Sequence, residues 1–105
     1  MVLVLKKGDK MSELIYENIN KAAKERKILA FSYRKRNGQI KQYSVEPYSF
    51  RDVNGRKALY AYDIDSNKTK RFLLCENEGM DGIIHTQVLE KNFVPRNDWD
   101  VEIGK

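Results

Sequence analysis

Two Asn-Gly pairs, Asn37-Gly38 and Asn54-Gly55, are the features of this sequence that most constrain its fold. Each pair lies between two runs in which apolar and polar residues alternate, as in "ILAFSYRKR" before the first pair. A type I′ turn needs a positive φ angle at both central residues, and Asn followed by Gly is the pair that adopts it most readily. The sequence therefore predicts two tight β-hairpins.

The alternating runs around these turns predict a meander of five short strands. Their expected ranges are residues 28–36, 39–46, 48–53, 56–63 and 69–75. Pro47 separates the second range from the third, because a proline cannot donate a hydrogen bond to a neighbouring strand, and it predicts a bend there. The run "GIIHT" near the C-terminus suggests a sixth short strand.

A helix is expected before the strands, in "SELIYENINKAAKER", where apolar residues recur every three or four positions and Ser12 is the candidate N-cap. One helix cannot cover both faces of a five-stranded sheet, so the sheet should curl into a small open barrel. Residues 12–105 are expected to form one domain, and residues 1–11 a leader or arm. The expected C-terminal contacts with the barrel are Phe93, Trp99, Val101 and Ile103.

Charge is distributed unevenly along the chain, whose net charge is +5. Residues 21–71 carry 14 Lys or Arg against 5 Asp or Glu, whereas residues 72–105 carry 3 against 7. A basic segment of this kind is typical of proteins that bind polyanions, although surface lysines also serve only to keep a small protein in solution. Charge alone leaves both interpretations open.

Catalysis, metal binding and membrane insertion are not favoured by the sequence. Cys75 is the only cysteine, and its position after "FLL" is typical of a small buried side chain rather than of a nucleophile activated by His85. Asp63 and Asp65 lack the ligand spacing of a calcium loop. The apolar run "VLVL" is too short for a signal peptide or a membrane span. We therefore expect a cytoplasmic protein that is not an enzyme and needs no cofactor or metal.

Several short motifs between Tyr16 and Arg96 appear in the order and spacing of a known family. They are "ILAFSY", "YSVEPYSF", "GRKALYAYD", "KRFLL" and "NFVPR", with a Val-x-Pro at Val45 and Pro47 and a closing Phe-x-Pro-Arg at Phe93, Pro95 and Arg96. In these motifs the chain resembles the WYL domain family. It departs from the family where the Trp-Tyr-Leu triplet is replaced by Ala58, Leu59 and Tyr60, and where Asp-Arg-Ile is replaced by Cys75, Glu76 and Asn77.

The resemblance implies an SH3-like or Sm-like barrel of about five strands that serves as a sensor or nucleic-acid-binding module. In bacterial transcription regulators such a barrel is usually attached to a winged-helix DNA-binding domain. This sequence holds no such domain, so it is more similar to stand-alone accessory WYL proteins near defence systems or in mobile elements. The family's strand arginine falls on Lys70, or on Arg71 if the register slips by one residue.

The leading hypothesis is a regulatory or accessory domain that binds single-stranded RNA, single-stranded DNA or a nucleotide-like anion on a basic face of the barrel. Arginine and lysine neutralise phosphates, and aromatic rings stack on unpaired bases. The candidate binding residues are Arg71, Lys70, Arg51, Arg34, Tyr33 and Tyr48. The alternative is a protein-interaction or dimerisation module whose charges only solvate it. Both hypotheses are compatible with a homodimer.

Overall fold

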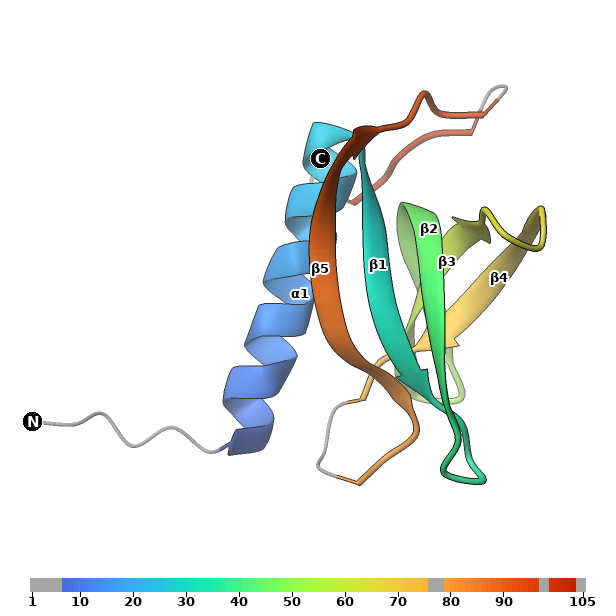
Figure 1. Cartoon of the computed structure of the whole chain (residues 1–105). Helices are drawn as coiled ribbons and strands as arrows, with labels where there is room; N and C mark the ends of the chain where they lie inside the picture. Colours follow the sequence, from blue (N-terminus) through green and yellow to red (C-terminus); the bar gives the residue numbers. More distant parts are fainter. Residues whose placement is uncertain (1–6, 76–78, 97–98, 104–105) are drawn as a thin grey trace, which may run out of the picture.

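A computed structural model describes residues 7–75, 79–96 and 99–103, with side chains from residue 13 onward. It contains one helix followed by a single antiparallel sheet (Figure 1). The elements are α1 (Lys7–Glu25), β1 (Lys27–Arg34), β2 (Ile40–Val53), β3 (Arg56–Asp63), β4 (Lys68–Leu73) and β5 (Gly82–Asn92). Their order in the sheet is β4-β3-β2-β1-β5. The predicted fold class, mostly β with one N-terminal helix, is confirmed.

Both predicted hairpins are present, but only the second has the predicted turn. Asn54 and Gly55 have φ angles of 51° and 83°, and the strand residues on either side of them pair directly. Gly38 has a φ of 91°, whereas Asn37 is not among the described residues with positive φ, so the type I′ prediction is wrong there. The first hairpin has a longer loop, in which the Asn37 side chain accepts a hydrogen bond from the Gln39 backbone at 2.9 Å.

β2 unites two strands that were expected to be separate. Its first half pairs with β1, its second half pairs with β3, and the register shifts between Pro47 and Ser49. Pro47 therefore marks a bend, as predicted, but does not interrupt the strand. A bulge allows this because it leaves a residue unpaired while the strand continues. The bend turns β3 and β4 away from β1 and β5 (Figure 1).

The two ends of the chain also extend further into regular structure than expected. α1 begins at Lys7, so Ser12 lies inside the helix and is not its N-cap. Polar residues can continue a helix because intrinsic propensities differ by less than about 1 kcal/mol per residue. The run "GIIHT" is the start of the 11-residue strand β5, which pairs with β1 along most of its length. Beyond the end of β4, Leu74 bridges Ile83, which brings the two edges of the sheet together there.

The core lies between α1 and the concave side of the sheet. α1 contributes Ile15, Ile19, Ala22 and Ala23, all buried, and lies along β5 and β1 (Figure 1). The strands contribute residues such as Leu29, Val45 and Leu59, which are fully buried. The C-terminal segment adds Phe93, Val101 and Ile103 to this core, as predicted, and Trp99 covers its rim with 36% of its surface exposed. Over the described residues, α1 is not apolar enough to cross a membrane.

Candidate functional site

Strand register decides which of the basic and aromatic residues share a face of the sheet. Leu29 pairs with Val45 and Leu59 pairs with Phe72, and these four buried residues define what we call the inner face. Side chains alternate along each strand, so the inner face also carries a lysine and a tyrosine of β2 and two lysines of β4. We call these four residues, Lys41, Tyr43, Lys68 and Lys70, the inner cluster.

Tyr43 is the centre of the inner cluster. The Nζ atoms of Lys41 and Lys70 lie 5.1 and 5.4 Å from the centroid of its ring, within the range of cation–π attraction. The ring also packs against Phe31 and Phe72, with centroids 5.6 and 4.9 Å away, and both of these rings are buried. Tyr43 is therefore held by the core on one side, and the residue is only partly exposed.

Asp63 positions Lys70 within the inner cluster. The Asp63 Oδ2 atom lies 3.0 Å from Lys70 Nζ and also accepts a hydrogen bond of 2.8 Å from Ser66. Burial by itself would raise the pKa of Asp63, but these hydrogen bonds outweigh it and the pKa is lowered. Asp63 is thus ionised and balances one lysine. Lys41 and Lys68 are exposed, so the inner cluster as a whole is cationic.

The opposite face, which we call the outer face, carries a second group of cations around Tyr60. Arg71 is the direct cross-strand neighbour of Tyr60, and the Arg51 guanidinium lies 5.1 Å from its ring centroid. A cleft of about 230 Å³ opens between this face and the C-terminal segment. The residues lining the cleft are Tyr48, Ser49, Arg51, Tyr60, Trp99, Asp100 and Glu102. We call it the outer cleft.

A buried polar network holds the C-terminal segment beside the outer cleft. Arg96 donates from Nε and Nη2 to the two carboxylate oxygens of Glu46, at 3.0 and 2.9 Å, and its guanidinium stacks 3.7 Å from the Tyr62 ring centroid. Tyr48 donates to Glu46 at 2.8 Å and accepts from the Arg96 backbone at 3.1 Å. Only 2% of Tyr48 is exposed, so in this structure it presents no free face to a ligand.

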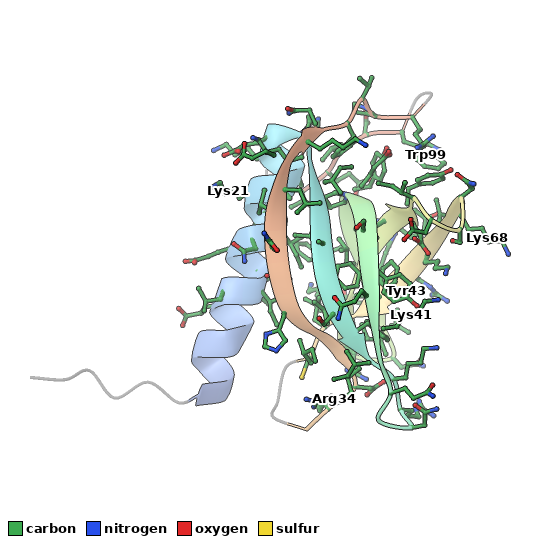
Figure 2. All side chains as sticks on the ribbon, viewed as in Figure 1. Lys21, Arg34, Lys41, Tyr43, Lys68 and Trp99 are labelled. Carbon is green, nitrogen blue, oxygen red and sulfur yellow. The ribbon has the colours of Figure 1, made fainter. Side chains whose placement is uncertain are left out.

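The six candidate binding residues are divided among several places. Lys70 is in the inner cluster, and Tyr33 is half-buried on the same face, where burial raises its pKa and its hydroxyl accepts from the Leu73 backbone. Arg71 and Arg51 lie together on the outer face. Arg34 lies at the end of the sheet opposite Trp99 (Figure 2), and it donates to the Met80 carbonyl at 3.3 Å.

Sequence reasoning missed Lys41, Tyr43, Lys68 and Tyr60 as members of these groups. The spacing Lys41-x-Tyr43 places both residues on one face of a strand, and that signal was available. Which face they share depends on the pairing of Tyr33 with Lys41 across the hairpin loop. The loop is longer than the predicted turn, so the sequence did not indicate this register.

The residues considered for catalysis or metal binding have other roles. Cys75 is 3% exposed, and its Sγ atom lies 3.4 Å from the Met80 carbonyl oxygen. His85 is exposed on β5. The Asp63 carboxylate closes its own turn by accepting from the Asp65 backbone at 3.2 Å. Within the described ranges, no three Cys, His, Asp or Glu side chains gather in a group able to hold a metal ion.

Comparison with known proteins places this fold in a family. The structure is similar to the proteasome accessory factor PafBC of Arthrobacter aurescens, with a TM-score of 0.67 and 20% identity. The match covers 81% of this chain but only 13% of that protein, so the likeness concerns the fold of one segment. No curated protein matches the sequence. A family model for the WYL domain matches residues 15–76, from the middle of α1 to just beyond β4. With well over half of its residues matched, including every strand that builds the inner cluster, the chain belongs to the WYL domain family.

Proposed function

We propose that this WYL domain is a non-catalytic regulatory or accessory module that binds single-stranded nucleic acid, or a nucleotide-like anion, through the inner cluster. The observation that carries the proposal is the placement of two lysine ammonium groups over the partly exposed ring of Tyr43. A third ammonium, that of Lys68, belongs to the same face. Positive charge and an aromatic surface thus occur together on β2 and β4, whereas α1 packs mainly against β5 and β1.

Each part of this arrangement matches a part of an unpaired nucleotide. Lysine side chains neutralise phosphates and release condensed counterions, which makes binding dependent on salt. An aromatic ring offers a stacking surface that accepts any base, because every base has a π face. The lysine stems are flexible, so their ammonium groups can move from the ring of Tyr43 to phosphates beside a stacked base. The site is expected to prefer single strands over duplexes, whose bases are already stacked.

Fluorescence anisotropy of labelled single-stranded RNA and DNA over a salt series tests the proposal. Lys41→Ala and Lys68→Ala each remove one exposed ammonium from the inner cluster. Lys21→Ala is the matched control, because it removes the same charge from α1 on the opposite side of the molecule (Figure 2). We avoid substituting Lys70, because its loss would leave the buried Asp63 without its charged partner.

The expected slope of log affinity against log salt is about −0.7 per phosphate contacted by a single strand. Lys41→Ala and Lys68→Ala should each weaken binding and make this slope shallower by a comparable amount, whereas Lys21→Ala should leave it unchanged. Equal effects of all three variants would mean that only net charge matters and would contradict a site at the inner cluster. Absence of binding at low salt, together with a dimer in a size measurement, would favour the interaction module instead.

A further inference from the structure

Strand β4 carries cations on both faces of the sheet. It is an edge strand, and the next strand inward, β3, separates it from β2. Lys68 and Lys70 belong to the inner face, whereas Arg71, between Lys70 and the buried Phe72, belongs to the outer face. A flexible polyanion that follows these cations crosses the edge of the sheet within the width of one strand, about 5 Å.

Beyond that edge, the outer face continues the same alternation of cation and aromatic ring. Arg71 on β4, Tyr60 on β3 and Arg51 on β2 form a row across three neighbouring strands. Arg71 is exposed, and Tyr60 is partly exposed. The row spans about 10 Å at the usual spacing of strands, and it ends at the outer cleft, where Trp99 forms one wall.

The size and the lining of the outer cleft suit one nucleotide of a longer strand. Its volume of about 230 Å³ is below the roughly 300–1,000 Å³ of pockets that enclose a whole small ligand. Tyr60 and Trp99 supply two aromatic surfaces, and Arg51 supplies a guanidinium for a phosphate beside the base. Asp100 and Glu102 also line the cleft, so the phosphate has to lie on the Arg51 side, away from these carboxylates. Such a cleft holds part of a ligand whose remaining affinity comes from elsewhere on the protein.

Glu102 restrains Arg51 only weakly. The ion pair between them is a single contact of 3.5 Å, and the two side chains are 46% and 58% exposed. Exposed pairs of this kind contribute about 0–1 kcal/mol, so a phosphate can replace the carboxylate. The backbone of Glu102 remains anchored, because its N–H donates to the Tyr48 carbonyl at 2.7 Å. The carboxylate therefore competes with a phosphate for Arg51 without the segment having to detach.

From these observations we propose a second nucleotide-binding subsite in the outer cleft, reached by a single strand that leaves the inner cluster and passes over β4. The inference rests on the proposed function, because the inner cluster supplies the first contacts. Arg71 and Arg51 bind phosphates along the path, and a base stacks between Tyr60 and Trp99. A short strand should therefore occupy only the inner face, whereas a longer strand should also reach the outer cleft.

Trp99 makes this subsite directly observable, because it is the only tryptophan in the sequence. Unlabelled single strands of about 4 and about 16 nucleotides, lengths that bracket the site sizes of small barrels, are titrated while tryptophan emission is recorded. The long strand should quench Trp99 and the short strand should not. Arg51→Ala and Arg71→Ala should each lower the affinity for the long strand by about threefold or more and make its salt slope shallower by about 0.7. The affinity for the short strand should not change.

The Glu102→Gln variant should change the affinity for the long strand in the opposite direction. Removal of its charge should strengthen binding of the long strand, whereas Glu90→Gln, which removes an exposed carboxylate paired with Lys27, should have no such effect. Thermal unfolding of each variant confirms that it remains folded.

The outer subsite and the proposed function would be contradicted by different results. Suppose that the long strand binds and that Lys41→Ala and Lys68→Ala weaken its binding. If it then leaves Trp99 emission unchanged and binds the Arg51→Ala and Arg71→Ala variants with unchanged affinity, the outer subsite is wrong and the inner cluster stands. If Lys41→Ala and Lys68→Ala have no effect on either strand, the proposed function itself is wrong.

Discussion

Glu46 illustrates how one buried carboxylate organises the C-terminal half of the molecule. Its residue is 5% exposed, and it accepts two hydrogen bonds from Arg96 and one from Tyr48. A bidentate pair between arginine and a carboxylate is among the stronger polar contacts in proteins and also fixes geometry. Tyr48 completes the network by accepting from the Arg96 backbone. The network therefore holds Arg96 against β2, beside the outer cleft.

Because the Tyr48 hydroxyl is buried, we expect the protein to lose stability at alkaline pH. Burial raises the pKa of Tyr48 to about 12, above the usual value of about 10 in an unfolded chain. Below pH 10 the hydroxyl is neutral in both states, and its stabilising effect is fully present. Between about pH 10 and 12 the unfolded state ionises first, so this contribution, on the order of 1–2 kcal/mol, is lost as pH rises.

Urea unfolding of the protein and of Tyr48→Phe, measured at several pH values, checks this expectation. The difference in free energy of unfolding between the two proteins should be constant below pH 10 and should shrink as pH approaches 12. Other tyrosines titrate in both proteins and cancel in the difference. A difference that does not change with pH would show that the Tyr48 hydroxyl does not have the raised pKa.

At the scale of the elements, two glycines at the starts of β3 and β5 are required for different reasons. Gly55 has a φ of 83°, and a Cβ atom there would meet nothing within 4 Å. Gly82, which begins β5, has a φ of 126°, and its Cβ would lie 2.7 Å from the Leu73 carbonyl oxygen. Gly82 thus allows two stretches of backbone to approach where the sheet edges meet, whereas Gly55 serves only the conformation of a hairpin.

Alanine substitution at these two glycines should therefore have unequal costs. Gly55→Ala should destabilise the fold by about 1 kcal/mol, the conformational cost alone. Gly82→Ala adds overlap with backbone atoms that cannot move aside as side chains do, and it should cost about 3 kcal/mol or more. Chemical denaturation of both variants measures these costs. Similar losses would indicate that the backbone at Gly82 relaxes freely.

At the scale of the whole molecule, Arg56 fastens the bent sheet into a partly closed barrel. From the start of β3 it donates to the Asp81 carboxylate at 3.1 Å, to the Asp81 carbonyl at 2.8 Å and to the Leu74 carbonyl at 3.1 Å. These bonds lie beside the bridge between Leu74 and Ile83. The closure thus ties the chain just beyond β4 and just before β5 to the start of β3.

Arg56→Lys should loosen this closure without unfolding the protein. Lysine keeps the positive charge but cannot reach several acceptors in one plane as a guanidinium does. Hydrogen exchange of the Leu74 amide should become faster by about tenfold, the effect of losing about 1.4 kcal/mol of local stability, while amides of α1 such as that of Ile19 stay protected. Acceleration spread equally over α1 and the sheet would instead indicate a global loss of stability.

The sequence by itself determined the features that depend on neighbouring residues. Asn54-Gly55 specified its turn because the φ angles required are a local property, and three- and four-residue spacing specified the apolar side of α1. Alternation along β4 showed that Lys70 and Arg71 would point to opposite faces. The apolar character of Phe93, Val101 and Ile103 was enough to predict their burial, which the structure confirms.

Only the tertiary structure decided how these local pieces combine into surfaces. Tyr43 meets Lys70 because β2 bends at Pro47 and pairs with β1 before the bend and with β3 after it. Tyr48 was a candidate for stacking, yet its place in the Glu46 network depends on a segment almost fifty residues further along the chain. Register and packing between distant segments are set by the total burial of the core, which no single stretch of sequence contains. For that reason the sequence predicted most of the strands and Lys70, Arg71 and Arg51 as candidate cations, whereas the structure alone showed which side chains lie together.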